Sequence, residues 1–393
     1  MVSLKPPVPD LPVLTPEPVA ERQFDDPDAA VEALIAHYAA STAWLRERFE
    51  AVMRGASAEG RYRAFYPQIT ISTSSFAKVD SRLSFGHVSE PGRYATTVTR
   101  PDLFRNYLTQ QIGLLMENHG IPVTIGPSER PIPLHFAMTA DSHVEGSIED
   151  RLHRPLRDLF DVPDLNVTDD RIVNGDGLFD AAGTRALAPF TAQRIDYSLA
   201  RLAHYCASAP EHFQNHVLFT NYQFYVDEFV AYARAAIADP ESGYEALIEP
   251  GNVITTATGT TGTPPAKPPQ MPTYHLTRAN TSGITMVNIG VGPSNAKTIT
   301  DHIAVLRPHA WLMLGHCAGL RNSQALGDYV LAHAYVREDN VLNEDIPLSV
   351  PIPPLAEVQV ALEDAVEEVT GYTGYELKKI MRTGTVATID NRN

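Results

Sequence analysis

The chain has 393 residues, of which 44% are hydrophobic and 20% charged, so it can bury sizeable cores; disorder throughout, a coiled coil and a collagen-like repeat are excluded. Its 47 acidic against 31 basic residues give a net charge of −16, which would repel a phosphate backbone, and two cysteines cannot build a disulfide framework or a cysteine-rich zinc site. Because no apolar run approaches the ~18 residues of a membrane span, we expect a cytoplasmic protein of two or three domains, without a nucleic-acid or membrane partner.

The first hundred residues predict a proline-rich tail and the start of an α+β domain. Six prolines and no helical or strand period mark residues 1–20, so we expect a disordered tail there. Apolar residues recur at spacings of three, four or seven over 31–52, which predicts a helix. Runs rich in Ile, Thr, Phe and Val within 62–98 then predict antiparallel strands, such as 68–72 and 94–98.

A second helix is expected to open at Thr99, whose hydroxyl can cap the first turn. Its apolar stripe runs to Gly120, which follows Asn and His as a stop signal. A strand-like run at 131–136 and a polar stretch at 161–183 complete a domain that we assign to 21–183.

The second domain, 184–393, is predicted to begin with a helical region over 194–237. The segment 255–269 is rich in Thr, Gly and Pro and has no apolar period, so we predict that it is mobile. Strand-like residues precede it at 252–255 and follow it at 273–276. We therefore favour a long hairpin loop within one domain.

The pattern after this loop is typical of an α/β fold. Runs at 284–289, 311–314 and 329–336 predict buried strands, and 295–306 predicts a helix between the first two. Strand, helix and strand in that order favour a right-handed crossover and a mostly parallel sheet. A later helix, 357–369, has apolar residues on one face and acidic residues on the other.

A glycine-rich turn joins the first of these strands to its helix. Gly290 and Gly292 allow a ligand to approach the backbone, and the helix that begins near Ser294 presents free N–H groups to an anion. An ordinary turn capped by Ser294 explains the spacing equally well. The turn is not a Walker loop, and Asn295 stands where the dinucleotide fingerprint has its third glycine.

A second run of small residues, Gly315 to Gly319, follows the next strand and lies where open α/β sheets bind ligands. It contains His316 and Cys317, but adjacent residues on a strand point to opposite faces, so we favour a buried Cys317 over a thiol nucleophile.

The spacing of the histidines and arginines does not predict a binding site. Histidines at 302, 309 and 316 cross a helix, a loop and a strand, so we reject a metal site. Four arginines in the first domain are interpreted as surface charges, with phosphate binding as the alternative. They are Arg93, Arg100, Arg105 and Arg130.

Three segments of the second half strongly resemble bacterial AMP nucleosidases: 290–298, 307–320 and 326–333. Thr220 to Tyr222, Tyr225 to Phe229, 352–354, 356–359 and Arg382 to Val386 match as well. The resemblance spans most of 20–393. It implies an α/β fold: a three-layer catalytic domain like that of nucleoside phosphorylases, with a mostly parallel mixed sheet, preceded by an α+β regulatory domain.

The resemblance implies hydrolysis of AMP to adenine and ribose 5-phosphate, with AMP and water as partners. The adenine must be protonated as it leaves, while the ribose becomes oxocarbenium-like. The glycine loops and the segment at 383–384 are expected to line the ribose and phosphate pocket, and the resemblance implies that a strand at 383–388 joins the central sheet. The candidate binding residues are Gly290, Gly292, Pro293, Ser294, Asn295, Gly315, His316, Cys317, Ala318, Gly319, Thr383 and Gly384.

The family places its carboxylate acid and a ribose-gripping Met-Glu segment beyond the match at Arg382 to Val386. No position up to Asn393 matches either, so no catalytic residue is carried over. We expect the domain to be incomplete at its carboxyl end and to turn over little, unless Asp328 or Asp390 serves as the acid.

The resemblance also implies activation by MgATP, inhibition by phosphate and a homo-oligomer, a hexamer, with no cofactor for the chemistry. Two alternatives remain open: a phosphate-dependent phosphorylase and a non-catalytic nucleotide-binding regulatory protein.

Overall fold

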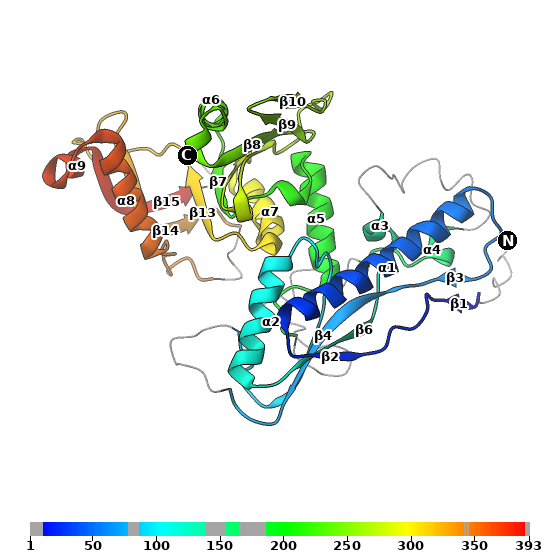
Figure 1. Ribbon diagram of the computed structural model, residues 1–393. Coiled ribbons are helices and arrows are strands. Elements are labelled where there is room, and N and C mark those ends of the chain that lie inside the picture. Colours follow the sequence, from blue (N-terminus) through cyan, green and yellow to red (C-terminus); the bar gives the residue numbers. More distant parts are fainter. Residues whose placement is uncertain are drawn as a thin grey trace, which may run out of the picture. The chain divides into compact units, whose positions relative to one another are not determined.

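The computed structural model describes residues 11–77, 86–138, 155–164, 168, 186–341, 343 and 346–389. They form two compact units, unit 1 (Met1–Ala200) and unit 2 (Arg201–Asn393) (Figure 1). Residues 1–10, Asp390 and nearly all of the polar stretch from 165 lie outside the described residues. No helix in the described part is long and apolar enough to cross a membrane.

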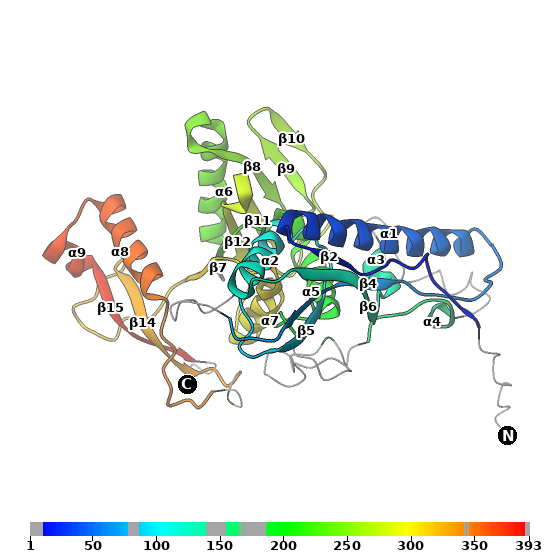
Figure 2. The ribbon, with the colours of Figure 1, turned by 60° about the horizontal axis from the view of Figure 1, so that its bottom comes forward.

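Unit 1 packs one long helix against a four-stranded antiparallel sheet, as predicted (Figure 2). Asp26 caps the helix by accepting a hydrogen bond from the Ala29 N–H at 2.8 Å, and Pro27 begins it. Tyr38, Leu45 and Phe49 then bury one face of the helix in the core. In sheet order the elements are β2 (Arg22–Phe24), β6 (Val123–Pro131), β4 (Phe65–Thr73) and β5 (Gly92–Thr97), with α1 (Pro27–Met53).

The second helix, α2 (Arg105–His119), begins later than predicted. Thr99 does not cap it, because it lies five residues before Phe104, which precedes the first helical residue. The Thr99 hydroxyl instead donates to the buried carboxylate of Asp196 at 2.6 Å. The predicted stop is confirmed, since Gly120 adopts the left-handed conformation and closes the helix.

Short segments complete unit 1. Val13 and Leu14 pair with Arg61 and Tyr62, so this part of the expected disordered tail is ordered. The run predicted as a strand at 131–136 instead turns into a helix after β6. The short elements are β1 (Val13–Leu14), β3 (Arg61–Tyr62), α3 (Leu134–Ala137) and α4 (Leu156–Leu159).

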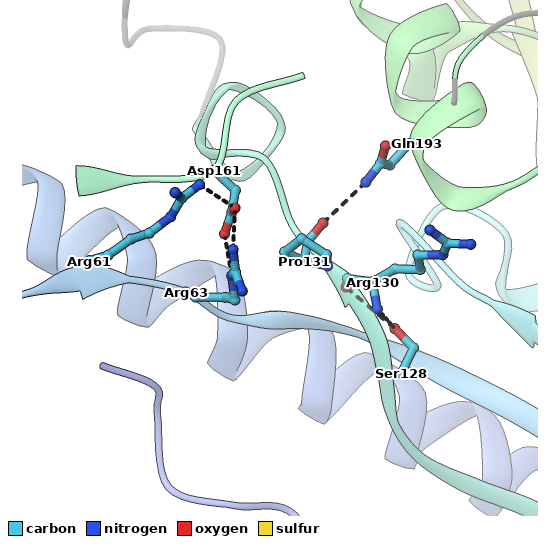
Figure 3. Close-up of polar contacts among 7 residues, drawn as sticks. All are labelled: Arg61, Arg63, Ser128, Arg130, Pro131, Asp161 and Gln193. Atoms are coloured by element: carbon cyan, nitrogen blue, oxygen red, sulfur yellow. Dashed lines mark hydrogen bonds and ion pairs between the residues drawn. The ribbon is translucent and has the colours of Figure 1, made fainter. Parts of the chain in front are cut away.

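A shared carboxylate fixes the segment after α4. Asp161 accepts from Arg61 at 2.7 Å and from Arg63 at 2.8 and 2.9 Å, as Figure 3 shows. Gln193 donates to the Pro131 carbonyl at 3.3 Å in the same view. The arginine contacts join residues about 100 positions apart in the sequence, and the Gln193 contact joins residues 62 apart.

Unit 2 is a three-layer α/β unit, as expected. One helix, α6, covers one face of a seven-stranded mixed sheet, and α5 and α7 cover the other. Four of the six strand pairings are antiparallel, which corrects the expectation of a mostly parallel sheet. In sheet order the strands are β10 (Gly259–Thr261), β9 (Val253–Thr256), β8 (Tyr244–Glu249), β11 (Thr273–Arg278), β12 (Ile284–Asn288), β7 (His216–Thr220) and β13 (Ala310–Leu314).

The helical region predicted over 194–237 is in fact interrupted by β7. The helices of the sheet are α5 (Ala192–Cys206), which contains the division between the units, α6 (Gln223–Ala238) and α7 (Pro293–Ile303). Single 3₁₀ turns occur at Pro210–His212, Pro240–Ser242, Ala279–Thr281 and Ala304–Leu306.

The Thr-rich segment 255–269 contributes to two strands, β9 and β10, which form a short hairpin whose outer strand, β10, is exposed. The flanking strands β9 and β11 do not pair with each other, because β8 lies between them. The long-hairpin prediction is therefore wrong in its pairing. The predicted mobility stays a prediction.

The last strands form a sheet of their own. β14 (Tyr329–Glu338) pairs in parallel with β15 (Met381–Ile389), and neither pairs with the seven-stranded sheet. This corrects the expectation that 329–336 and 383–388 join the central sheet. The helices α8 (Ala356–Thr370) and α9 (Gly374–Ile380) connect the two strands.

Candidate functional site

Three parallel strands end together at one edge of the unit 2 sheet. Asn288 of β12, Thr220 of β7 and Leu314 of β13 are in register, and each is the last residue of its strand. Both predicted glycine loops therefore lie at this edge. They are not on adjacent strands, because β7 lies between them, and two strand spacings of ~4.8 Å place them roughly 10 Å apart.

The first loop leads directly into α7. Gly290 and Gly292 have φ values of 67° and 107°, which an L side chain rarely adopts. No side chain caps α7, so the alternative of a turn capped by Ser294 is wrong. Pro293 carries no N–H. The N–H groups of Ser294 and Asn295 have no acceptor within the described part of the chain, so the helix start can bind an anion.

Between the two loops lies Asn221, directly after β7. Its side-chain oxygen is buried and has no hydrogen-bond partner among the described residues. That oxygen lies 3.6 Å from where a Cβ on Gly315 would be. Because a buried acceptor without a donor costs free energy, the position favours a ligand hydroxyl or amine.

Aromatic side chains accompany Asn221. The ring of Tyr222 lies 4.1 Å from that of His316, centroid to centroid, and Tyr225 lies 5.5 Å from the same histidine. The candidate list omitted Asn221 and Tyr222, because β7 was predicted as helix. The run Val217 to Thr220, rich in strand formers and followed by Asn, was the signal that could have located them.

The second loop is fully exposed from Gly315 to Leu320. Gln324 closes it by accepting from the Arg321 N–H at 3.1 Å, close to Gly319. Cys317 is exposed, so the prediction of a buried thiol is wrong. Burial, and to a smaller extent Cys317, raises the pKa of Tyr335 in β14.

The remaining predicted residues are not gathered here. Thr383 and Gly384 belong to β15, in the separate two-stranded sheet. Asp328 lies in the exposed loop before β14, where it accepts from the Ala325 N–H at 3.0 Å. The structure therefore assigns ten of the twelve candidates to the strand edge.

The arginines and histidines singled out in the sequence are dispersed. Arg100 pairs with Asp102, and Arg105 with Glu32. The three histidines have different ring neighbours: His302 lies against Tyr205, His309 against His216 and His316 against Tyr222. In the part of the chain that the structure describes, no three His, Cys, Asp or Glu side chains could hold a metal ion.

The largest pKa shifts occur away from this edge. In unit 1, burial raises the pKa of Asp196 to about 7, although hydrogen bonds from Thr99 and Tyr66 oppose the shift. In the unit 2 core, burial and then His212 hold the pKa of His275 well below its usual range. Burial also raises the pKa of Cys206 to about 12.

Comparison with known proteins supplies two matching family models. Residues 29–183 match the model "Bacterial AMP nucleoside phosphorylase N-terminus", and 244–393 match "Phosphorylase superfamily". AMP nucleosidases of Escherichia coli K12 and O157:H7 are each 46% identical over 334 residues, covering 84% of this chain and 68% of theirs.

Solved structures match more weakly. The AMP nucleosidase of Bacteroides thetaiotaomicron VPI-5482 is 25% identical, with a TM-score of 0.38, over 50% of this chain and 69% of its own. The purine nucleoside phosphorylase of Toxoplasma gondii, in complex with immucillin-H, is 16% identical, with a TM-score of 0.36, over 48% and 63%.

Proposed function

Because the chain belongs to the AMP nucleosidase family, we propose that it hydrolyses the N-glycosidic bond of AMP, releasing adenine and ribose 5-phosphate. The observation that carries the proposal is the strand edge. There an uncapped helix start and an unpaired buried amide oxygen lie at the ends of three parallel strands. The N–H groups of the helix start need a hydrogen-bond acceptor, and the amide oxygen needs a donor. A nucleotide supplies both, through its phosphate oxygens and its ribose hydroxyls.

The phosphate of AMP binds at the start of α7. The N–H groups of Ser294 and Asn295 donate to its oxygens, and the helix dipole favours its negative charge. Gly292 keeps the backbone open at this point, because a Cβ there would meet nothing within 4 Å. A free phosphate would occupy the same groups, which supports inhibition by phosphate.

The ribose binds between the loops. Asn221 accepts a hydrogen bond from a ribose hydroxyl, since its buried oxygen has no donor among the described residues, and the missing Cβ at Gly315 leaves room for the sugar to approach. A sugar fixed in this way is oriented for attack by water as positive charge develops at its anomeric carbon. The ring pair of Tyr222 and His316 lies beside Asn221 and offers a flat surface to the purine.

A phosphorylase is the second candidate, favoured by the match of 244–393 to the phosphorylase superfamily. In that reaction phosphate replaces water as the nucleophile, and the product is ribose 1,5-bisphosphate instead of ribose 5-phosphate.

Regulation and assembly extend the proposal. We propose activation by MgATP, a homohexamer and a cytoplasmic location, in line with the family resemblance. Large apolar side chains exposed near β13 support assembly. They are Trp311, Met313, Leu320 and Leu326.

The test measures the products formed from AMP by the purified protein, with and without added phosphate and MgATP. We expect adenine and ribose 5-phosphate in equal amounts without any requirement for phosphate. Ribose 1,5-bisphosphate formed only with phosphate would favour the phosphorylase. Binding of AMP without adenine release would favour the non-catalytic nucleotide-binding protein, and failure to bind AMP would also contradict the proposal.

A further inference from the structure

A cavity of about 240 Å³ that opens to solvent on one side lies in unit 1, independent of the strand edge and of the chemistry proposed for it. At ~30 Å³ for each water molecule, it has room for roughly eight waters, or one small ring. Its walls come from β4, β5 and α2, and from the segments 86–89 and 186–188.

The apolar walls of the cavity are firmly packed. Ile69, Ile112 and Leu115 line it and are at most 8% exposed. The side chains of Tyr94 and Tyr107 add aromatic surface. Such a cavity is formed before any ligand binds, which lowers the entropic cost of binding.

The segment 86–88 is fixed to the end of α2. Asn118 donates to the Gly86 carbonyl at 2.8 Å, and His119 accepts from the Val88 N–H at 2.9 Å. A Cβ on Gly86 would lie 2.6 Å from Leu114, so only glycine allows this approach. Two consecutive side chains thus hold one wall in place.

Three polar groups at the cavity have no hydrogen-bond partner among the described residues. They are the amide of Gln111, the hydroxyl of Thr96 and the buried Nδ1 of His87. The Tyr94 hydroxyl, in contrast, is occupied by the Glu90 carbonyl at 2.8 Å. Unpaired groups of this kind favour a ligand that both donates and accepts hydrogen bonds.

Among the described residues that line the cavity, none is Lys, Arg, Asp or Glu. Burial, and then His87, lowers the pKa of His119 behind the wall, so this histidine adds no positive charge near pH 7. A charged ligand group would lose its hydration here without gaining a counter-ion.

We propose that this cavity binds a neutral, flat nitrogen heterocycle of about one ring, held by Gln111 and Thr96 between apolar and aromatic walls. A hydrocarbon ring would leave the amide of Gln111 unpaired, and an anion would be desolvated without compensation. The site thereby differs from the strand edge of unit 2, which favours negative charge.

The experiment is a saturation-transfer NMR titration of the full chain with cytosine and uracil at neutral pH, with toluene and benzoate as comparison probes. We expect a dissociation constant of about 1 mM or tighter for at least one of the two bases. Benzoate and toluene should bind more weakly than that base.

Two variants locate the binding. Gln111→Leu keeps the volume but removes the amide, and we expect at least about tenfold weaker binding of the base. Gln110→Leu is its matched control, because Gln110 is the exposed neighbour on the same helix, and it should leave binding unchanged. Thr96→Val preserves the shape of the side chain but removes its hydroxyl. It should also weaken binding of the base, and it serves as the test if Gln111→Leu fails to fold.

Three outcomes would overturn the proposal. One is that neither base binds. Another is that the cavity variants bind the base as tightly as the wild type or the Gln110→Leu control. The third is that toluene or benzoate binds more tightly than either base.

Discussion

The buried carboxylate of unit 1 and the strand edge of unit 2 differ in how their polar groups are paired. In unit 1, Asp196 accepts from Tyr66 at 2.5 Å and from Thr99 at 2.6 Å, so this buried carboxylate is paired on both oxygens. At the strand edge of unit 2, the buried oxygen of Asn221 and the first N–H groups of α7 have no partner among the described residues. Paired groups fix a fold, whereas unpaired ones indicate where a ligand completes the structure.

The same contrast extends to titration. Unit 1 buries an acid whose pKa is raised, and unit 2 buries a histidine whose pKa is lowered. Both shifts arise mainly from burial, which disfavours the charged form of either group. Acidification should therefore change the contributions of these two groups to stability in opposite directions.

The largest expected effect concerns the unpaired oxygen of unit 2. In Gly315→Val, side-chain methyl groups would cover the Asn221 oxygen, since a Cβ there already lies 3.6 Å from it. We expect kcat/KM for adenine release from AMP to fall about a hundredfold, the loss typical of one fixed transition-state contact. Ala325→Val, in the exposed part of the same loop, is the control and should retain activity. If Gly315→Val and Ala325→Val had equal kcat/KM values, the Asn221 oxygen would have no role in ligand binding and the contrast between paired and unpaired groups would be wrong.

The second-largest expected effect concerns Asp196, the paired carboxylate of unit 1. Burial raises the pKa of Asp196 to about 7 from 3.8, so the folded chain holds the proton more tightly than the unfolded chain. Its contribution to stability is present below pH 3.8 and is lost as the pH rises through 7. We expect Asp196→Asn to raise the free energy of unfolding at pH 8 by about 2 kcal/mol and to remove this pH dependence.

Urea unfolding at pH 5 and pH 8 measures this change, with exposed Asp25→Asn as the control. A loss of stability at pH 8 in Asp196→Asn would show that the ionised carboxylate stabilises unit 1.

The buried histidine of unit 2 has the smallest effect. Because the pKa of His275 is held below 6.5, the unfolded chain takes up the proton first as the pH falls. Stability is therefore lost below pH 6.5, by up to ~1.4 kcal/mol for each pH unit. His275→Asn should flatten the dependence of the unfolding midpoint of unit 2 between pH 6.5 and 5. If the midpoint of His275→Asn changed with pH as much as that of the wild type, groups other than His275 would cause the pH dependence.

Local patterns predicted several elements of both units. The helix over 31–52, the strands at 68–72 and 94–98 and the strand–helix–strand unit from 284 to 314 all follow from periodicity and turn residues within one segment. The first glycine loop was located in the same way, because the positive φ values of Gly290 and Gly292 favour glycine at that strand end.

The remaining elements could not be predicted from the sequence, because their positions depend on pairing with distant segments. The strand β7 has only five residues between helices, and its place between β12 and β13 depends on partners about 70 and 90 residues away. Thr99 has good capping chemistry, yet its hydroxyl binds Asp196, 97 residues distant. The partners of β14 and β15 are likewise set by tertiary contacts that no local pattern contains.

One measurement tests the central claim, that the edge of β12, β7 and β13 binds the nucleotide through its phosphate. It compares the affinities of AMP and adenosine by calorimetry for the wild type, Gly292→Ala and Gly259→Ala. Both glycines have positive φ and open space around a Cβ, so the variants carry comparable strain. We expect AMP to bind at least about tenfold more tightly than adenosine. This advantage should disappear in Gly292→Ala and persist in Gly259→Ala. Equal affinities in the wild type, or an advantage that survives in Gly292→Ala, would contradict the account.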